Sequence, residues 1–453
     1  MANGKKPYSL DRRRFLKASA GAVGGLSLAG CAGMSTGGGG GAGAGNVQGT
    51  PVAGLNNQDV EGKTNITVWF WDEGLKYAVQ DYNKNNKKNV NVKFVKLSYD
   101  DTHNKLLTSL AAGSGAPDVC AIEIGQVGNF VTRGGLADLT TEFEGDQFKD
   151  DMVEYKWIHG SNQEGKLIAM PWDIGPAGMW YQPDVFKRAD LPTEPEEVGK
   201  RVQTWEDVMQ LGQDLRKKLP NTALFADAFN DIFVPIVEQK GHGWFQNNKL
   251  MFEEKGTPAL QAAVEARKNK VDANIDWWGA EWNEGLKQGA FQGMMIASWM
   301  QTGLTQSNPQ LIGKWRVVPP PEGNFNWGGS FLTIPAQGQN KEAAWDFVKY
   351  VCCTPEGQNA IFRSTGIFPA YKPAWKDPLY DQPVDFFGGQ KTFRLWTELA
   401  QNVPANVVNP NDRQAGDVVG NEITKVEKQG KDPAQAMKDA EAAALKRIQG
   451  IVG

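Results

Sequence analysis

The sequence predicts an α/β fold, and the first reason is a regular alternation of two kinds of segment. Apolar, strand-like runs alternate with segments whose apolar residues recur at helical spacing. In order, these segments cover residues 66–71, 75–87, 90–97, 101–112 and 118–123. Strand, helix, strand, helix, strand is the order expected of a parallel sheet.

Proline and glycine supply the second reason, because they divide the chain between two lobes. A strand-like run, Leu167–Met170, stops at Pro171, and three prolines at 319–321 cannot lie in a central strand. We therefore expect the chain to cross between lobes near residue 173, near 319 and again after a helix that ends at Cys353. The predicted lobes are residues 62–173 with 319–360, and residues 174–318 with 361–453.

The part of the chain after residue 181 is predicted to be richer in helix. Thr204 and Asp207 form a start that resembles a capping box, and Thr257 and Pro258 begin another helix. Further helices are expected over 281–292, 341–353, 389–401, 412–428 and from 433 to about 449, and strands over 293–299 and 315–318.

The amino terminus has the pattern of an export signal. Residues 11–17 carry paired arginines followed by Phe and Leu, and the apolar run after them is too short to span a membrane. This stretch resembles a twin-arginine signal, and Leu28–Cys31 resembles a lipobox. We expect residues 1–30 to be the signal and Cys31 to carry lipid, the alternative being a basic tail with an accidental cysteine.

The segment after Cys31 is dominated by Gly, Ala and Ser, which offer too little side chain to bury. We therefore predict that residues 31–61 form a flexible tether. The folded part would then lie outside the cytoplasm, anchored by lipid to the outer face of the cytoplasmic membrane.

Composition argues against several classes of partner. The 453 residues carry a net charge of −4, and no long basic block occurs in the folded part, so nucleic acid is not expected. The three histidines and the cysteines Cys120, Cys352 and Cys353 lack the spacing of metal ligands. No metal and no cofactor is predicted, and the pairing of Cys120 with Cys352 or Cys353 stays open.

Eight short motifs follow one another in an order that is typical of one protein family. They are Ile66–Trp71, Leu110–Val119, Gly134–Leu139, Gly165–Pro171, Trp180–Phe186, Thr204–Asp207, Phe291–Ile296 and Lys341–Val348. Each motif alone is weak, but the series resembles the extracellular solute-binding proteins of ABC sugar importers, the maltose-binding-protein-like group called family 1. The resemblance covers about residues 66–369. Met294–Ala297 and Ser298 depart from the usual pattern at the pocket floor.

This resemblance implies a two-lobed periplasmic-binding-protein fold of type II, with a hinge and a ligand cleft between the lobes. It also implies closure on binding and delivery of the ligand to the transmembrane subunits of an ABC permease. We expect a monomer that binds a carbohydrate, in particular an oligosaccharide, and does not catalyse a reaction.

The candidate binding residues follow from the chemistry of sugars. A sugar ring presents an apolar C–H face and a rim of hydroxyls, so its site needs flat aromatic side chains together with carboxylates, amides or backbone groups. Such residues stand at strand ends, at the predicted crossings and beside glycines that allow close backbone approach. They are Trp71, Glu73, Glu123, Trp172, Asp173, Trp244, Trp299, Trp327, Gly328, Gly329, Ser330 and Phe331.

Each candidate has an alternative role. The aromatic residues could belong to the core, Glu123 could cap a helix, and Trp244 could lie on a lobe surface. Four other tryptophans, at positions 277, 278, 282 and 345, are expected in the core because they have helical spacing.

Two other functions remain to be weighed. The same fold could bind another solute, such as a polyamine, a glycerophosphodiester or a metal chelate. An exported glycosidase would need paired carboxylates in a tryptophan-lined cleft, and Glu73, Glu123 and Asp173 are the candidates for those roles. The order of the motifs favours a binding protein, and the abundance of tryptophan favours a neutral, polyhydroxylated ligand.

Overall fold

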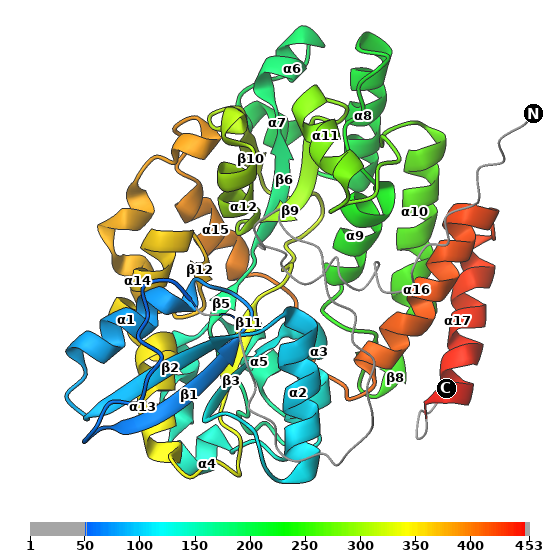
Figure 1. Cartoon of the computed structure of the whole chain (residues 1–453). Coiled ribbons are helices and arrows are strands. Elements are labelled where there is room, and N and C mark those ends of the chain that lie inside the picture. The colour runs from blue at the N-terminus through cyan, green and yellow to red at the C-terminus, as the bar shows by residue number, and fades with distance from the viewer. Residues whose placement is uncertain (1–49, 51, 449–453) are drawn as a thin grey trace, which may run out of the picture.

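The computed structural model describes residue 50 and residues 52–448, and the chain forms two lobes (Figure 1). The lower lobe in Figure 1 contains the first strands of the chain, and the upper lobe contains β6, β9 and β10. Residues 1–30 and Cys31 lie outside the described residues, so the predicted signal and lipid site stay predictions.

The first lobe is built on a five-stranded mixed sheet in the order β2-β1-β3-β11-β4. The strands β1, β2 and β3 are parallel, as the sequence predicts, and β11 and β4 are antiparallel to their neighbours. The strands are β1 (Thr64–Phe70), β2 (Val90–Lys96), β3 (Val119–Glu123), β4 (Met170–Pro171) and β11 (Ser330–Thr333). The helices of this lobe are α1 (Leu75–Asn85), α2 (Tyr99–Ala112), α3 (Ile124–Val131), α4 (Leu139–Phe143), α5 (Glu154–Gly160), α13 (Lys341–Cys353) and α14 (Pro355–Thr365).

The second lobe has an antiparallel three-stranded sheet in the order β10-β6-β9 and more helices. The strands are β6 (Ala177–Tyr181), β9 (Gly293–Ala297) and β10 (Arg316–Val318), with a hairpin of β7 (Phe245–Gln246) and β8 (Lys249–Leu250). The helices are α6 (Pro183–Arg188), α7 (Pro195–Arg201), α8 (Trp205–Lys218), α9 (Val234–Glu238), α10 (Thr257–Lys268), α11 (Ala280–Gln288), α12 (Met300–Ser307), α15 (Thr392–Ala400), α16 (Asp412–Gln429) and α17 (Pro433–Arg447).

The central strands are buried on both faces, which explains their apolar sequences. Every residue of β3, β6 and β9 is buried, and a strand covered on both sides reads as a continuous apolar run. The start of α8 is also as predicted: the Thr204 hydroxyl accepts from the Asp207 N–H, and the Asp207 carboxylate accepts from the Thr204 N–H, which completes the capping box.

The chain passes between the two sheets near residue 173 and again after residue 318. The short strand β5 (Asp173–Ile174) lies between β4 and β6, and residues 319–329 join β10 to β11. The third segment is the short strand β12 (Phe368–Pro369), which pairs antiparallel with β5. These three segments together form the hinge region between the lobes.

Two predicted boundaries need correction. The boundary at residue 360 falls inside α14, and this helix packs as a whole against α1 and α13 of the first lobe. The tether ends earlier than residue 61, because the Thr50 N–H donates to the Lys96 carbonyl (2.9 Å) and Val52 is buried. Asn57 both donates to and accepts from the Phe94 backbone. This segment therefore covers the otherwise unpaired edge of β2.

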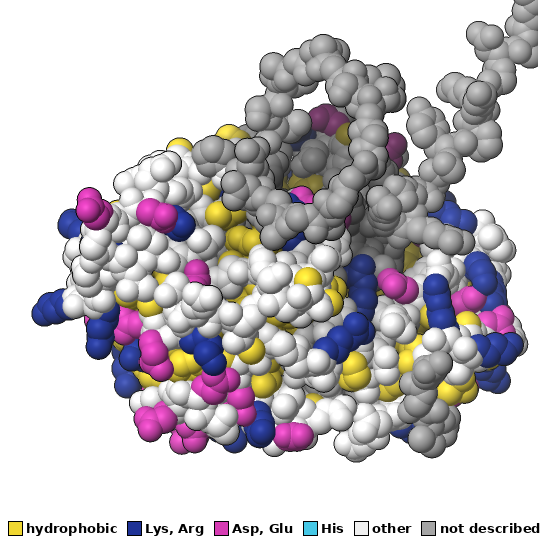
Figure 2. All heavy atoms as spheres, turned by 60° about the horizontal axis from the view of Figure 1, so that its bottom comes forward, with side chains coloured by type: hydrophobic (Ala, Val, Ile, Leu, Met, Phe, Trp, Pro, Cys, Tyr) yellow, Lys and Arg dark blue, Asp and Glu magenta, His cyan; other side chains and the backbone are white. Residues whose placement is uncertain are grey.

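The surface and the cysteines add little that is specialised. On the face of the first lobe that Figure 2 brings forward, acidic and basic side chains are interspersed. Cys120, Cys352 and Cys353 are buried free thiols, and the Cys353 Sγ lies 3.7 Å from the sulfur of Met170. None of the helices in the described part of the chain is long and apolar enough to cross a membrane.

Candidate functional site

A cavity of about 400 Å³ opens where the two lobes meet the hinge region. The first lobe supplies the residues that follow β1, the last residue of β3, and the end of α14, while the second lobe supplies Trp299 and α12. Nearly all of the predicted site lines this cavity: Trp71, Glu73, Glu123, Trp172, Asp173, Trp299, Gly328, Gly329 and Ser330. Residues that were far apart in sequence therefore converge on one space.

Trp71 is the aromatic wall on the first lobe. It follows β1 directly and is half-buried, with its ring centroid 4.6 Å from Phe70, 5.3 Å from Tyr99 and 4.9 Å from His103. Because three rings hold the indole from behind, little conformational freedom is left to lose when a ligand packs against it.

Trp299 is the facing aromatic wall on the second lobe. It follows β9 at the start of α12, and its Nε1–H donates to the Trp327 carbonyl at 2.7 Å. Its ring stacks on Trp278 at 6.0 Å with an interplanar angle of 20°. The half-buried indole is thus fixed in orientation before any ligand arrives.

Asp173 joins two hinge segments at the back of the cavity. The backbone N–H of Ser330 donates to its Oδ1, so this carboxylate connects β5 to the first residue of β11. Burial raises the pKa of Asp173 to about 6, while the nearby Lys156 acts in the opposite direction. An acid in this position can accept hydrogen bonds from a ligand. Its hydrogen bond to Ser330 also depends on how the two hinge segments are arranged.

Glu123 caps a helix and also has one carboxylate oxygen without a partner among the described residues. Its Oε2 accepts from the Gly125 N–H at 2.8 Å, as a cap of α3, and from the Tyr99 hydroxyl at 3.2 Å. The other oxygen, Oε1, is buried and has no hydrogen-bond partner among the described residues. Burial raises the pKa of Glu123 to about 7. A ligand hydroxyl would satisfy this oxygen.

The side chain of Glu73 is about half exposed to solvent. Its carboxylate pairs with the Lys96 ammonium at 2.6 Å and lies 4.0 Å from Lys76, and the bond to Lys96 lowers its pKa. The neighbouring Asp72 also lines the cavity, and its pKa is raised by burial. Sequence reasoning missed Asp72, although it stands in the same strand-end stretch as Trp71.

Other lining residues carried no recognisable signal in the sequence. They are polar side chains on helices or, for Lys96, at the end of β2, and their direction is decided only by how the lobes pack: Lys76, Tyr77, Lys96, Thr302, Gln306, Ser364 and Thr365.

Trp244 and Trp327 line a second, smaller cavity of about 170 Å³, not the first one. The two cavities share Gly328, so they are neighbours along the interface between the lobes. The backbone N–H of Trp244 donates to Asp412 Oδ1 at 2.7 Å, which ties the Trp244 backbone to the start of α16. The remaining walls are mostly apolar, and their charged or titratable side chains are Glu238, His242 and Arg413.

Phe331 is the one predicted site residue that lines neither cavity. It is fully buried in a core cluster of the first lobe. Successive side chains of a strand point to opposite faces, so the neighbour of the cavity-lining Ser330 turns away from the cavity. Trp172 is also 98% buried, with its ring 4.8 Å from Phe70, and offers only an edge to the cavity.

The tryptophans that we expected in the core are mostly there. Trp277, Trp282 and Trp345 are buried, and Trp345 stacks on Phe143 at 5.4 Å. Trp278 differs, because it is half-buried and supports the ring of Trp299 from behind.

The family model described as bacterial extracellular solute-binding protein matches residues 77–388, which is more than half of the chain. The chain belongs to this family. The resemblance that the eight motifs indicated is thereby confirmed, and the family places the protein outside the cytoplasm.

Relatives of known role agree with this assignment. The lactose-binding protein of Rhizobium radiobacter is 25% identical over 359 residues, covering 75% of this chain and 83% of that protein. The arabinooligosaccharide-binding protein of Bacillus subtilis (strain 168) is 26% identical over 426 residues, covering 87% and 96%. A solved extracellular solute-binding protein of family 1 superimposes with a TM-score of 0.77 at 25% identity, covering 84% of this chain and 99% of that one.

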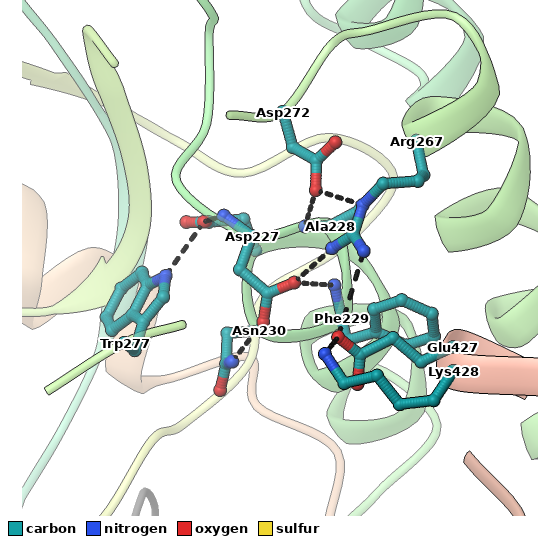
Figure 3. Close-up of polar contacts among 10 residues, drawn as sticks. Asp227, Ala228, Phe229, Asn230, Arg267, Asp272, Trp277, Glu427 and Lys428 are labelled. Carbon is teal, nitrogen blue, oxygen red and sulfur yellow. Dashed lines mark hydrogen bonds and ion pairs between the residues drawn. The ribbon is translucent and has the colours of Figure 1, made fainter. Parts of the chain in front are cut away.

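In this solute-binding protein, a buried ionic network supports the aromatic wall of the second lobe (Figure 3). Arg267 donates to Asp227 and to Asp272, at 2.7 Å each, and these two carboxylates accept from the backbone of the turn that begins at Ala228. Figure 3 shows the aspartates and Arg267 converging on this turn.

A third carboxylate, that of Asp231, extends the network toward the cavities. Asp231 accepts from the Trp277 Nε1–H at 3.0 Å and from the Met295 N–H of β9 at 2.9 Å. Trp277 in turn stacks on Trp327 at 5.4 Å. The network therefore fixes both the strand that leads to Trp299 and a ring that lies behind the second cavity.

Proposed function

We propose that this protein is the substrate-binding component of an ABC importer, and that it captures a carbohydrate between its lobes for delivery to the membrane permease. The observation that carries the proposal is the pairing of two fixed indoles, Trp71 and Trp299, with buried acceptors in one interlobe cavity. Aromatic faces suit the C–H face of a sugar, and carboxylates suit its hydroxyls. The names of the lactose-binding and arabinooligosaccharide-binding relatives support the same class of ligand.

The charges of the cavity favour a neutral ligand over a polyamine. Glu73 already pairs with Lys96, and the carboxylates of Asp173 and Glu123 face the buried ammonium of Lys156. The acids are thus balanced by lysines of the same chain. A polycation would have to displace these partners, whereas a sugar hydroxyl only needs a free lone pair.

An oligosaccharide fits the shape better than a single sugar. The larger cavity alone lies within the roughly 300–1,000 Å³ of typical ligand sites, and a second aromatic cavity continues beyond Gly328. Trp244 and Trp327 would provide an additional platform for a chain that passes this glycine. We propose that the protein binds this ligand as a monomer and without altering it.

A thermal-shift series tests the proposal directly. The purified protein would be heated with mono-, di- and trisaccharides, including lactose and arabinooligosaccharides, and with spermidine as the competing class. A ligand that binds only the folded state stabilises it by about 2.7 kcal/mol at a hundredfold excess over Kd. A shift with spermidine and with none of the sugars would overturn the carbohydrate proposal. Chromatography of the recovered sugar would show whether it leaves intact.

We also propose that Cys31 carries the lipid that anchors the protein, on the basis of the export and lipobox patterns. Cys31→Ala is expected to release the mature protein from the membrane fraction, because no other anchoring segment is predicted. Cell fractionation measures this, with Cys120→Ala as the control for a buried thiol that should stay with the membrane. Retention of the Cys31→Ala protein on membranes after normal signal cleavage would contradict the assignment.

We further propose that the lobes close on the ligand by rotation in the three hinge segments. Saturating sugar is expected to lower the radius of gyration, because cavity walls from both lobes can contact one ligand only when the lobes approach. Small-angle scattering with and without ligand measures this change. An unchanged radius of gyration at saturation would indicate a rigid site.

A further inference from the structure

Lys156 is a fully buried cation whose ammonium has no hydrogen-bond partner among the described residues. It belongs to α5 of the first lobe, and its Nζ lies 3.6 Å from the centroid of the Phe331 ring. An aromatic face attracts a cation, but it does not replace the hydrogen bonds that an ammonium makes in water. Such a group is costly to bury, so a compensating interaction is required.

The ammonium lies directly behind the wall of the larger cavity. A Cβ placed on Gly329, which lines the cavity, would come 3.0 Å from the Lys156 Nζ. The charge therefore lies close to the cavity wall at Gly329. Gly329 also has φ +104°, a conformation that favours glycine. A residue with a side chain would therefore be strained at this position of the wall.

The two cavity-lining acids face this charge from different elements. Asp173 of β5 and Glu123 of β3 exert the largest attraction on the Lys156 ammonium. Neither carboxylate forms an ion pair with Lys156 within 4.0 Å in the described part of the chain, and Glu123 Oε1 has no partner there. The acids are thus held at a distance from the lysine, and Glu123 Oε1 is left available to a ligand.

We infer that Lys156 is a positioning residue of the ligand site, which keeps Glu123 and Asp173 ionised so that both accept hydrogen bonds from sugar hydroxyls. This inference rests on the proposed carbohydrate function. The lysine itself does not touch the ligand, because its ammonium is buried. It acts through the field that it exerts on the two acids across the wall at Gly329.

Other charged or titratable groups lie near Glu123, Asp173 and Lys156. Glu123 is faced by Tyr99 and His103 of α2, His242 of the second lobe and Lys156, and Asp173 is faced by Lys156 and Asp72. Lys156 is also near Cys352 of α13 and His159 of its own helix. Burial lowers the pKa of His103 to about 4, and the pKa of His159 also lies well below its usual value, so both rings are neutral at pH 7. Lys156 is then the fully buried cation that faces both acids.

The sign of the pH dependence follows from these groups. If binding requires carboxylates, affinity is complete above their pKa values and is lost as the pH falls through about 7 for Glu123 and about 6 for Asp173. Removing the Lys156 charge raises both pKa values further, because the charge that favours ionisation is gone. The loss of affinity therefore begins at a higher pH in a variant without this lysine.

Lys156→Met is the variant of choice, since a thioether of similar length packs well on the Phe331 ring. Calorimetric titration with the sugar found in the thermal-shift series, between pH 5 and 9, should place the midpoint of affinity loss about one pH unit or more above that of the wild type. Near pH 7 this corresponds to roughly fivefold weaker binding, because the ionised fraction of Glu123 falls from about one half to about one tenth. Lys268→Met, at an exposed position of α10, is the control and should leave the midpoint unchanged.

Further variants identify the responsible acid and protect the test against misfolding. Glu123→Gln should remove the part of the pH dependence near pH 7 and leave the part that belongs to Asp173. If Lys156→Met does not fold, the double variant Lys156→Met with Glu123→Gln removes one of the two buried carboxylates that lose their cation, and its remaining midpoint should lie above that of Glu123→Gln alone.

The possible outcomes distinguish a failure of this inference from a failure of the proposed function. A Lys156→Met protein that binds sugar with the wild-type midpoint, or a double variant with the midpoint of Glu123→Gln, overturns the inference. A wild-type protein that binds no sugar overturns the proposed function instead. In that case, infrared titration of the protonated carboxyl band in ligand-free wild type, Lys156→Met and Glu123→Gln still decides whether Lys156 sets the ionisation of Glu123.

Discussion

Replacing Trp299 with alanine is expected to weaken sugar binding roughly thirtyfold or more, which corresponds to about 2 kcal/mol of binding free energy. The indole is half-buried, stacked on Trp278 and tied to the Trp327 carbonyl, so its face is presented to the cavity at little further entropic cost. Alanine removes that face. It also leaves the Trp327 carbonyl without its indole donor.

Calorimetric titration of the Trp299→Ala protein, together with its melting temperature, measures the effect. Trp345→Phe is the packing control, because Trp345 is buried in the first lobe against Phe143 and lines neither cavity. The control should lower stability more than affinity. Unchanged affinity in Trp299→Ala, or a loss fully explained by unfolding, would show that Trp299 serves the core and not the ligand.

The sequence predicts that Trp299 lines the cavity because the signal there is local. An apolar strand that ends in an aromatic residue at the mouth of a cleft gives a visible signal, and Trp71 and Asp173 carry the same kind of signal. The parallel strands of the first lobe are predicted for a related reason, since alternation of strand and helix is a local property of the chain.

Where the structure differs from the predicted arrangement of the site, the reason lies in partners that are distant in sequence. Phe331 is adjacent to residues of the cavity wall, but the strand β11 turns its ring into the core. Trp244 and Trp327 line a separate cavity because α16, far along the chain, forms its other side. Lys156 gives no sign in the sequence that its charge is buried. That fact depends on Phe331 and Gly329, which come from another segment.

Arg267→Met is expected to lower the free energy of unfolding by about 3 kcal/mol or more at neutral pH, because it leaves two buried carboxylates without their common cation. The Asp227 and Asp272 side chains are almost completely buried, and the guanidinium donates to both (Figure 3). Urea denaturation at several pH values measures the loss. Arg394→Met removes a pair that is open to water on both sides, and it should change stability little.

The pH dependence of this loss identifies its cause. Burial raises the pKa of Asp227 to about 6, above its value in the unfolded chain, and Arg267 opposes that rise. A carboxyl whose pKa is raised on folding destabilises the protein as the pH climbs from about 4 to the folded pKa. Without Arg267 that pKa rises further, so the penalty continues to grow above pH 6 and is smallest near pH 4. A loss that is equal at pH 4.5 and pH 7.5 would mean that Arg267 stabilises the second lobe by packing on Phe229, and not by holding Asp227 and Asp272.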